Sequence, residues 1–150
     1  MNKTIYILLS SICICLFAAG CGIDVEYAYH TTLTFKNESS HKIEINVDSK
    51  IHHEKEPWSC IIKPKEDYSH IKSGDSPWII EYIMNDGCVV TFDDEIAVDH
   101  RNTNIEHNLC DESSYTAKVS GRHDTETTYT YVFTDEDYER AVAANTESEE

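Results

Sequence analysis

Basic side chains are scarce in this sequence of 150 residues, which has 12 lysines and arginines against 28 aspartates and glutamates and a formal net charge of -16. A nucleic-acid-binding protein needs a basic surface to replace the counterions on phosphates, so this balance argues against DNA or RNA as a partner. The apolar fraction of 40% and the aromatic fraction of 10% argue against disorder. They predict one compact domain.

Catalytic signature motifs are lacking as well. The sequence has no strained elbow of the type GxSxG, no phosphate-binding loop and no GxGxxG segment. Serines, histidines and carboxylates are abundant, but without such a motif their co-occurrence singles out no nucleophile and no acid–base pair. We therefore predict a protein that is not an enzyme, with no catalytic residues, no metal site and no cofactor.

Long apolar runs are confined to the first twenty residues. Lys3 gives a short positive start, the apolar run spans residues 5–17, and the small residues at 18–20 follow. This is the anatomy of a signal peptide, and the run is shorter than the roughly 20 residues that span the hydrocarbon of a bilayer. We predict that residues 1–20 are a signal peptide. Its removal takes away one lysine and no acid, so the net charge becomes -17.

The junction AAGC, which ends at Cys21, resembles the lipobox of bacterial lipoproteins. In that family, cleavage before the cysteine exposes a new amino terminus that carries diacylglycerol through a thioether. The resemblance implies that Cys21 is lipidated and that residues 21–30 form the lipidated N-terminus and tether, with the membrane as a partner. Acyl chains contribute about 0.8 kcal/mol per buried methylene, so two or three of them hold a protein to a bilayer. Plain secretion is the alternative, because Ala18 stands where the family usually has leucine.

Three cysteines remain after the signal peptide and Cys21, namely Cys60, Cys88 and Cys110. Their wide spacing fits none of the CxxC arrangements that zinc or thioredoxin chemistry needs. Cys60 and Cys88 alternate with apolar residues in strand-like runs, which predicts buried, unreactive thiols. The alternative is a Cys88–Cys110 disulfide, which would close a loop across the most polar part of the chain.

A period of two, the period of β-strands, dominates from residue 31 onward. Apolar residues alternate with polar ones at 33–35 and at 43–47, and the turn-like segment 37–40 predicts that these two runs form an antiparallel hairpin. Further strands are expected at 58–62, 68–71, 78–84, 88–92, 96–98, 115–119 and 127–133, with a helical turn as the alternative at 78–84. From these nine runs we expect about seven to eight short strands, which predicts a mainly β protein, a sandwich or a small barrel.

The period changes at the end of the chain. Thr134 is followed by three acids at 135–137, which is the pattern of a helix N-terminus with a capping box. An apolar stripe follows, so we expect one short C-terminal helix with Asn145 as the cap at its end. The sandwich with this closing helix is expected to span residues 31–145, and residues 146–150 form an acidic tail.

Four segments resemble small lipoproteins of Bacteroidota that carry one immunoglobulin-like β-sandwich. They are TFKNESSHKIEINV near the start of the domain, IIKPKEDYS, VVTFDDEIAVDH and TYTYVFTDEDYERAVAAN at its end. The resemblance implies an immunoglobulin-like antiparallel sandwich that is anchored by lipid to the outer membrane of a bacterial cell envelope. It brings no catalytic or ligand-binding residues with it.

The polar segment 99–114 is the expected long loop of the domain. It holds His100 and His107 beside Asp99 and Glu106, a cluster that would gather a zinc or calcium ion if the loop folded back on itself. Solvated side chains are the preferred interpretation. The alternative function is a small metal-dependent or carboxylate hydrolase with its site in this loop.

Aromatic side chains give the hypothesis about binding. The chain has 9 tyrosines and 2 tryptophans, and exposed aromatic rings stack on sugars or anchor protein interfaces. Most of them alternate with polar residues on expected strands, so core packing accounts for the majority. We therefore expect a lipid-anchored interaction or structural module with a glycan or protein partner.

Overall fold

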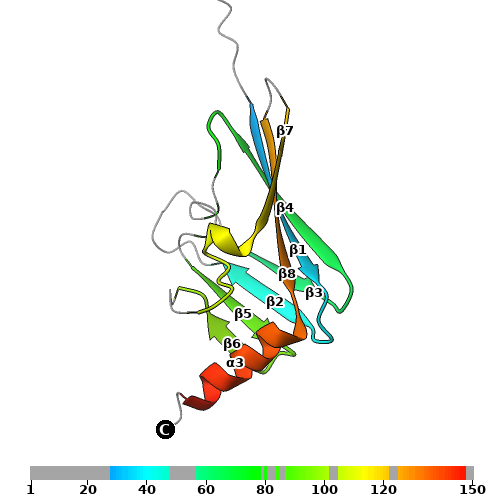
Figure 1. Ribbon diagram of the computed structural model, residues 1–150, viewed down its shortest axis with the longest axis vertical. Helices are drawn as coiled ribbons and strands as arrows, with labels where there is room; N and C mark the ends of the chain where they lie inside the picture. Colours follow the sequence, from blue (N-terminus) through cyan, green and yellow to red (C-terminus); the bar gives the residue numbers. More distant parts are fainter. Residues whose placement is uncertain are drawn as a thin grey trace, which may run out of the picture.

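The computed structural model describes residues 28–47, 57–78, 80, 84, 87–101, 105–121 and 125–147. Within them, eight strands form two four-stranded sheets, and one α-helix closes one end (Figure 1). The first sheet has the order β4 (Asp67–Gly74), β1 (Tyr29–Asn37), β8 (Thr125–Phe133) and β7 (Thr116–Ser120). The second has the order β3 (Trp58–Ile62), β2 (Ile43–Val47), β5 (Cys88–Phe92) and β6 (Ile96–Asp99). The predicted mainly β sandwich of seven to eight strands with one C-terminal helix is confirmed.

Among the described strands, the pairs are antiparallel with one exception. β1 pairs with β8 in parallel, in a register that runs from Tyr29 opposite Thr125 to Asn37 opposite Phe133. The first and last of the described strands therefore lie side by side in the middle of the first sheet. The expectation of a purely antiparallel sandwich is corrected at this pair, since strand periodicity carries no information on strand direction.

The link between β1 and β2 is not the expected hairpin, because the two strands lie in different sheets. Asn37, at the end of β1, is only 1% exposed. Its Nδ2 donates to the carbonyls of His41 and Ile62 at 2.7 and 3.0 Å, and its Oδ1 accepts from the backbone N–H of Ser39 at 3.0 Å. The buried amide thus supplies partners for a segment that crosses between the sheets. The hairpin prediction is wrong, because turn residues suit both a reversal and a crossing.

The core lies between the two sheets and follows the predicted alternation. Its buried strand residues are Leu33, Phe35, Ile43, Ile45, Val47, Cys60, Ile62, Cys88, Val90, Phe92, Tyr129, Tyr131 and Phe133. β7 differs, because all its residues are exposed and Val119 is 65% exposed. The first sheet extends beyond the second at the end where β7 lies (Figure 1). Of the residues at 115–119, where we expected alternating burial, only Tyr115 is buried in the core.

The strand expected at 78–84 is not present at Ile80, which is helical. The backbone N–H of Met84 donates to the carbonyl of Ile80 at 2.8 Å, the bond of a helical turn. Both side chains are fully buried. Apolar residues on both faces fit a buried helical turn as well as a central strand, so the period could not distinguish them. Most of this segment lies outside the described residues.

The helix α3 (Asp135–Glu147) begins at the predicted capping box. The backbone N–H of Thr134 donates to Oδ2 of Asp137 at 2.8 Å, and the N–H of Asp137 donates to the Thr134 carbonyl at 3.1 Å. The helix continues past Asn145, so the expected cap at that residue is wrong. Instead, Nδ2 of Asn145 donates to the carbonyl of Ala97 in β6 at 3.0 Å, and so attaches the helix to the second sheet.

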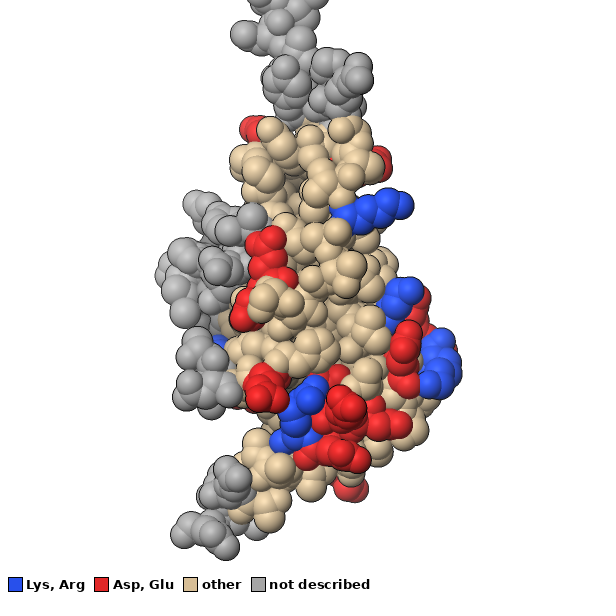
Figure 2. Space-filling model, in the orientation of Figure 1, with Lys and Arg blue, Asp and Glu red and all other residues tan. Residues whose placement is uncertain are grey.

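Charged side chains are unevenly distributed over the face that Figure 2 shows. Acidic and basic groups gather in the lower half of this face, around the end that α3 closes, and the upper half carries few of them (Figure 2). Acids are interspersed with lysines and arginines there. The excess of negative charge in the sequence is therefore partly offset locally at this end of the domain.

Candidate functional site

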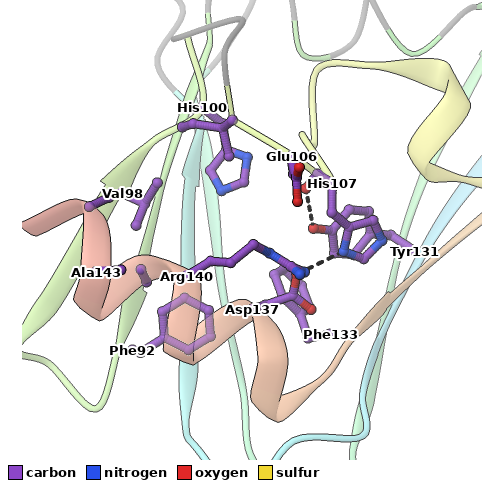
Figure 3. A pocket seen from close by; sticks show the side chains of 13 residues that line it. Phe92, Val98, His100, Glu106, His107, Tyr131, Phe133, Asp137, Arg140 and Ala143 are labelled. Atoms are coloured by element: carbon purple, nitrogen blue, oxygen red, sulfur yellow. Dashed lines mark hydrogen bonds and ion pairs between the residues drawn. The ribbon is translucent and has the colours of Figure 1, made fainter.

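A pocket of about 420 Å³ opens between α3, β6 and the loop that contains residues 105–107 (Figure 3). Its lining residues are Phe92, Val98, His100, Ile105, Glu106, His107, Tyr131, Phe133, Asp137, Arg140, Ala141, Ala143 and Ala144. Aromatic and aliphatic side chains form much of the wall, and the polar groups come from the loop and from one face of α3. This is the composition that small-ligand sites share.

Asp137 holds the polar side of the pocket together. Its Oδ1 accepts hydrogen bonds from Nδ1 of His107 at 2.7 Å and from Nη2 of Arg140 at 2.6 Å. Its Oδ2 accepts from the backbone N–H and the hydroxyl of Thr134, at 2.8 and 3.1 Å. The side chain is 8% exposed. One carboxylate therefore caps α3, positions an arginine and attaches the loop that carries His107.

The protonation of this carboxyl follows from its partners. Burial raises the pKa of Asp137, but the hydrogen bonds from His107, the Thr134 backbone and Arg140 outweigh burial. The pKa of Asp137 therefore lies below its usual value, and the group is an anion at neutral pH. Its charge is offset within the pocket by the guanidinium of Arg140.

His107 is fixed from several sides. Its ring stacks on Tyr131 with the ring centroids 4.2 Å apart, and the Tyr131 hydroxyl donates to the carbonyl of His107 at 2.6 Å. The backbone of His107 has a φ of +54°, in the left-handed region. Burial raises the pKa of Tyr131, so that its hydroxyl stays a donor. The position of the loop at the pocket is therefore set by contacts with β8 and α3.

His100 lines another part of the pocket and is a neutral group. It is buried, and its Nδ1 accepts a hydrogen bond from the backbone N–H of Leu109 at 3.1 Å, which puts the ring proton on Nε2. Burial lowers the pKa of His100 to about 4. Figure 3 shows Arg140 pointing from α3 toward Asp137, with His100 and Phe92 on either side of its side chain.

The polar cluster expected in the loop 99–114 is thus assembled in part. His100, His107 and Glu106 line one pocket, whereas Asp99 instead accepts hydrogen bonds from the Nε of Arg101, at 2.8 Å from Oδ1. The described residues contain no group of three or more His, Cys, Asp or Glu side chains that could hold a metal ion. Beyond Asp99, which ends β6, the described part of the segment has one 3-10 turn, η1 (Glu112–Ser114), and otherwise no regular structure before β7.

Cys60, Cys88 and Cys110 are free thiols in the structure. Cys60 and Cys88 are buried, as predicted, and burial raises the pKa of Cys60 to about 12. Cys88 and Cys110, the pair of the alternative prediction, are neighbours, and the interaction between them raises the pKa of Cys88 and lowers the pKa of Cys110. Cys21, the predicted site of lipidation, lies outside the described residues.

The described aromatic residues include core side chains and partly exposed ones. Tyr115, Tyr129 and Tyr131 are buried, so they belong to the core. Trp58 is partly buried and stacks on His70, with the ring centroids 4.4 Å apart. Core packing therefore accounts for these three tyrosines, in line with the expectation for the majority of the aromatics.

Two pocket residues were not expected from the sequence as site residues. Asp137 was interpreted only as a capping acid, and Arg140 was not singled out. Their spacing of three residues on a helix puts both on one face, which is the only sequence signal that joins them. What places that face against His107 is the packing of α3 on β6, a contact between distant parts of the chain.

Comparisons with known proteins add no relative to this description. No protein-family model matches the chain, and no curated protein or solved structure matches it at a significant level. Within the described residues, no helix combines the length and the apolar character needed to cross a bilayer.

Proposed function

We propose that this chain is a lipid-anchored β-sandwich protein of the bacterial cell envelope, and that its domain is a non-enzymatic binding module. The observation that carries the binding function is the pocket of about 420 Å³ formed by α3, β6 and the 105–107 loop, since small-ligand sites occupy roughly 300–1,000 Å³. The signal-peptide pattern and Cys21 support the anchor in the outer membrane.

The arrangement of the domain supports this function. β1 begins at Tyr29 at one end of the long axis, and α3 lies at the other end (Figure 1). A tether from Cys21 therefore enters the domain at the end away from the pocket. A ligand presented by another molecule can reach the pocket while the lipid stays in the bilayer.

The lining of the pocket favours a polar ligand that carries no negative charge and has one apolar face. Arg140 offsets the anionic Asp137, Glu106 adds an exposed acidic side chain, and Phe92 and Phe133 contribute aromatic surface. Aromatic rings beside convergent polar groups suit a sugar ring, which has both an apolar face and hydroxyls. We therefore propose a single sugar unit of a glycan as the occupant.

Ligand-observed saturation-transfer NMR tests this proposal with the full chain in detergent and glucose, galactose, mannose and N-acetylglucosamine as probes. We expect transfer to at least one sugar and its loss in Ala143→Phe, because Ala143 lines the pocket and a phenyl ring there fills it. Val142→Phe is the matched control, since Val142 lies on the same helix but does not line the pocket. No transfer from any sugar, or equal transfer in both variants, would contradict the proposal.

The anchor is tested separately by intact mass spectrometry of the protein isolated from bacterial membranes. We expect the wild-type protein to begin at Cys21 and to carry the added mass of diacylglycerol with or without a further acyl chain. Cys21→Ser is expected to lack the lipid and to leave the membrane fraction. A wild-type protein without lipid would refute the anchor.

The contact between His107 and Asp137 favours a second candidate, a carboxylate-assisted hydrolase. A histidine whose Nδ1–H is held by a buried carboxylate can take a proton from water at Nε2. We rank it second because capping of α3 and the arginine contact already account for Asp137. Assays with p-nitrophenyl acetate and p-nitrophenyl glycosides test it. A hydrolase would show turnover that His107→Gln abolishes, and absence of turnover in the wild type excludes these two substrate classes.

A further inference from the structure

Two thiols from distant parts of the chain meet at the start of β5. Cys88 is the first residue of that strand and is 2% exposed, and Cys110 lies just before η1 and is half-buried. The Cys110 thiol donates to the carbonyl of Met84 at 3.5 Å, and the same carbonyl accepts from the backbone N–H of Gly87, the residue before Cys88, at 2.7 Å. The Cys110 sulfur therefore lies beside the start of β5, where the side chains of Cys88 and Cys110 are neighbours that shift each other's pKa.

The backbone on both sides of this contact is held in place. The N–H of His100 donates to the Cys88 carbonyl at 2.8 Å, and the His100 ring accepts from the N–H of Leu109 at 3.1 Å. The N–H of Cys110 donates to Oδ1 of Asn108 at 2.7 Å. A disulfide requires Cα atoms about 4.4–6.8 Å apart and side chains that point toward each other. The hydrogen bonds that link Cys88 to His100 and His100 to Leu109 keep the two cysteines neighbours, so the folded chain already brings the two thiols to the same place.

Cys60, the third thiol of the domain, lies apart from Cys88 and Cys110. Cys60 lies on β3, on the far side of β2 from β5. In the sheet register it is opposite Ile45, whereas Cys88 is opposite Val47. Cys60 is therefore the matched control for the pair.

We propose that Cys88 and Cys110 are joined by a disulfide when the protein is in an oxidising compartment. The oxidant is the disulfide form of a thiol–disulfide oxidoreductase, or a small-molecule disulfide in vitro. That the protein meets such an oxidant in cells rests on the proposed envelope location. The contact between the two thiols does not depend on that location.

The reaction balances as a thiol–disulfide exchange. The Cys110 thiolate attacks one sulfur of the oxidant and releases the other as a thiolate. Cys88 then loses its proton and attacks the Cys110 sulfur of the mixed disulfide, which releases the second thiolate of the oxidant. Two protein thiols are oxidised with loss of two protons and two electrons, and one oxidant disulfide is reduced to two thiols.

The environment of each sulfur suits these roles. The interaction with the Cys88 side chain lowers the pKa of the Cys110 thiol, which raises its thiolate fraction. The interaction with Cys110, followed by burial, raises the pKa of the Cys88 thiol. Cys110 is also the more exposed of the two, so it is the sulfur that an oxidant reaches first. Cys88 is the resolving thiol.

The disulfide would restrict the position of one wall of the pocket. Cys110 closes the loop that carries His100 and His107, both of which line the pocket. A disulfide to β5 fixes the far end of that loop to the second sheet, while Asp137 holds its middle. The oxidised protein therefore presents the pocket wall in one position.

The test uses the full chain, equilibrated with oxidised glutathione, alkylated under denaturing conditions and mapped by mass spectrometry. We expect one linked pair of peptides that contain Cys88 and Cys110, lighter by two hydrogens, with Cys60 alkylated. The oxidised form is expected to melt roughly 5–10 °C above the reduced form, because the bond closes a loop of about 23 residues. Cys60→Ser should keep this difference, and Cys110→Ser should abolish it.

Two results would overturn the proposal. One is alkylation of Cys60, Cys88 and Cys110 alike after oxidation, and the other is a link that involves Cys60. The peptide map of the wild-type chain needs no variant, so a variant that fails to fold does not affect it. A protein that forms the bond in vitro but is reduced and unlipidated when isolated from cells would refute the location and leave the thiol pair intact.

Discussion

Nδ1 of His107 lies 2.7 Å from Oδ1 of Asp137. This hydrogen bond joins two elements that the sequence separates by thirty positions, the loop before η1 and the first turn of α3. Because the other oxygen of Asp137 caps the helix through Thr134, the start of α3 and the wall of the pocket depend on the same carboxylate. Loss of this group is therefore expected to affect the helix and the loop together.

Asp137→Asn tests this coupling. The amide keeps one acceptor oxygen but presents an NH₂ group where a carboxylate oxygen accepted hydrogen bonds, so one set of buried partners loses its acceptor. We expect the free energy of unfolding to fall by about 3 kcal/mol in urea denaturation followed by circular dichroism. Glu136→Gln is the control, because it removes an exposed charge from the same turn and should cost about 0.5 kcal/mol. Equal losses in the two variants would contradict the role given to Asp137.

The buried His100 predicts a pH dependence of stability. Burial lowers the pKa of His100 from 6.5 to about 4, so between these values the unfolded chain binds more protons than the folded one. Stability should therefore fall as the pH decreases from 6.5 to 4, by up to roughly 3 kcal/mol from this residue. Urea denaturation at several pH values measures the slope.

His100→Asn separates this effect from other acid-sensitive groups. The asparagine oxygen can accept from Leu109 in place of Nδ1, but it does not titrate. The variant should be less stable at pH 7 and show a flatter slope between pH 6.5 and 4. His30→Asn, at a histidine that contacts Ser73 on the neighbouring strand, should keep the wild-type slope. An unchanged slope in His100→Asn would show that other groups cause the acid sensitivity.

The sequence predicted the strands well, because one-sided burial leaves a clear period of two. It did not predict which strands pair, and the segment after Asn37 shows why. Turn residues specify a change of chain direction. Whether the chain reverses within one sheet or crosses to the other sheet depends on contacts with residues that are distant in the sequence, such as Ile62. For the same reason, the loop 99–114 could be proposed as a site, whereas its contact with Asp137 and Arg140 could not.

Asn37→Ala tests the importance of that crossing. The substitution removes the donors to His41 and Ile62 and the acceptor for Ser39, which leaves several buried polar groups without partners. We expect a loss of about 3 kcal/mol in the free energy of unfolding. Asn46→Ala on the exposed side of β2 should cost less than about 0.5 kcal/mol. If both variants unfold at the same urea concentration, the buried amide does not stabilise the crossing.

The turn between β5 and β6 gives a prediction of increased stability. Glu95 N–H donates to the Phe92 carbonyl at 3.0 Å, and the two central residues, Asp93 and Asp94, have φ values of +51° and +65°. This is the geometry of a type I′ turn, whose second central position favours glycine. Asp94→Gly relieves the strained backbone and gives up only an exposed ion pair with Lys42. We expect a gain of about 0.5 kcal/mol, measured as a higher melting temperature.

Asp93→Gly is the matched comparison, because it relieves the same kind of backbone strain one position earlier. However, Oδ2 of Asp93 accepts from Nδ1 of His41 at 2.6 Å, and Oδ1 accepts from the backbone N–H of Lys42 at 2.9 Å. These bonds join the turn to the segment that crosses between the sheets, and they hold the pKa of Asp93 below its usual value. Loss of both bonds should outweigh the relief of strain, so Asp93→Gly should melt below the wild type and Asp94→Gly above it. The reverse order would mean that backbone strain, and not the side-chain contacts, dominates at Asp93.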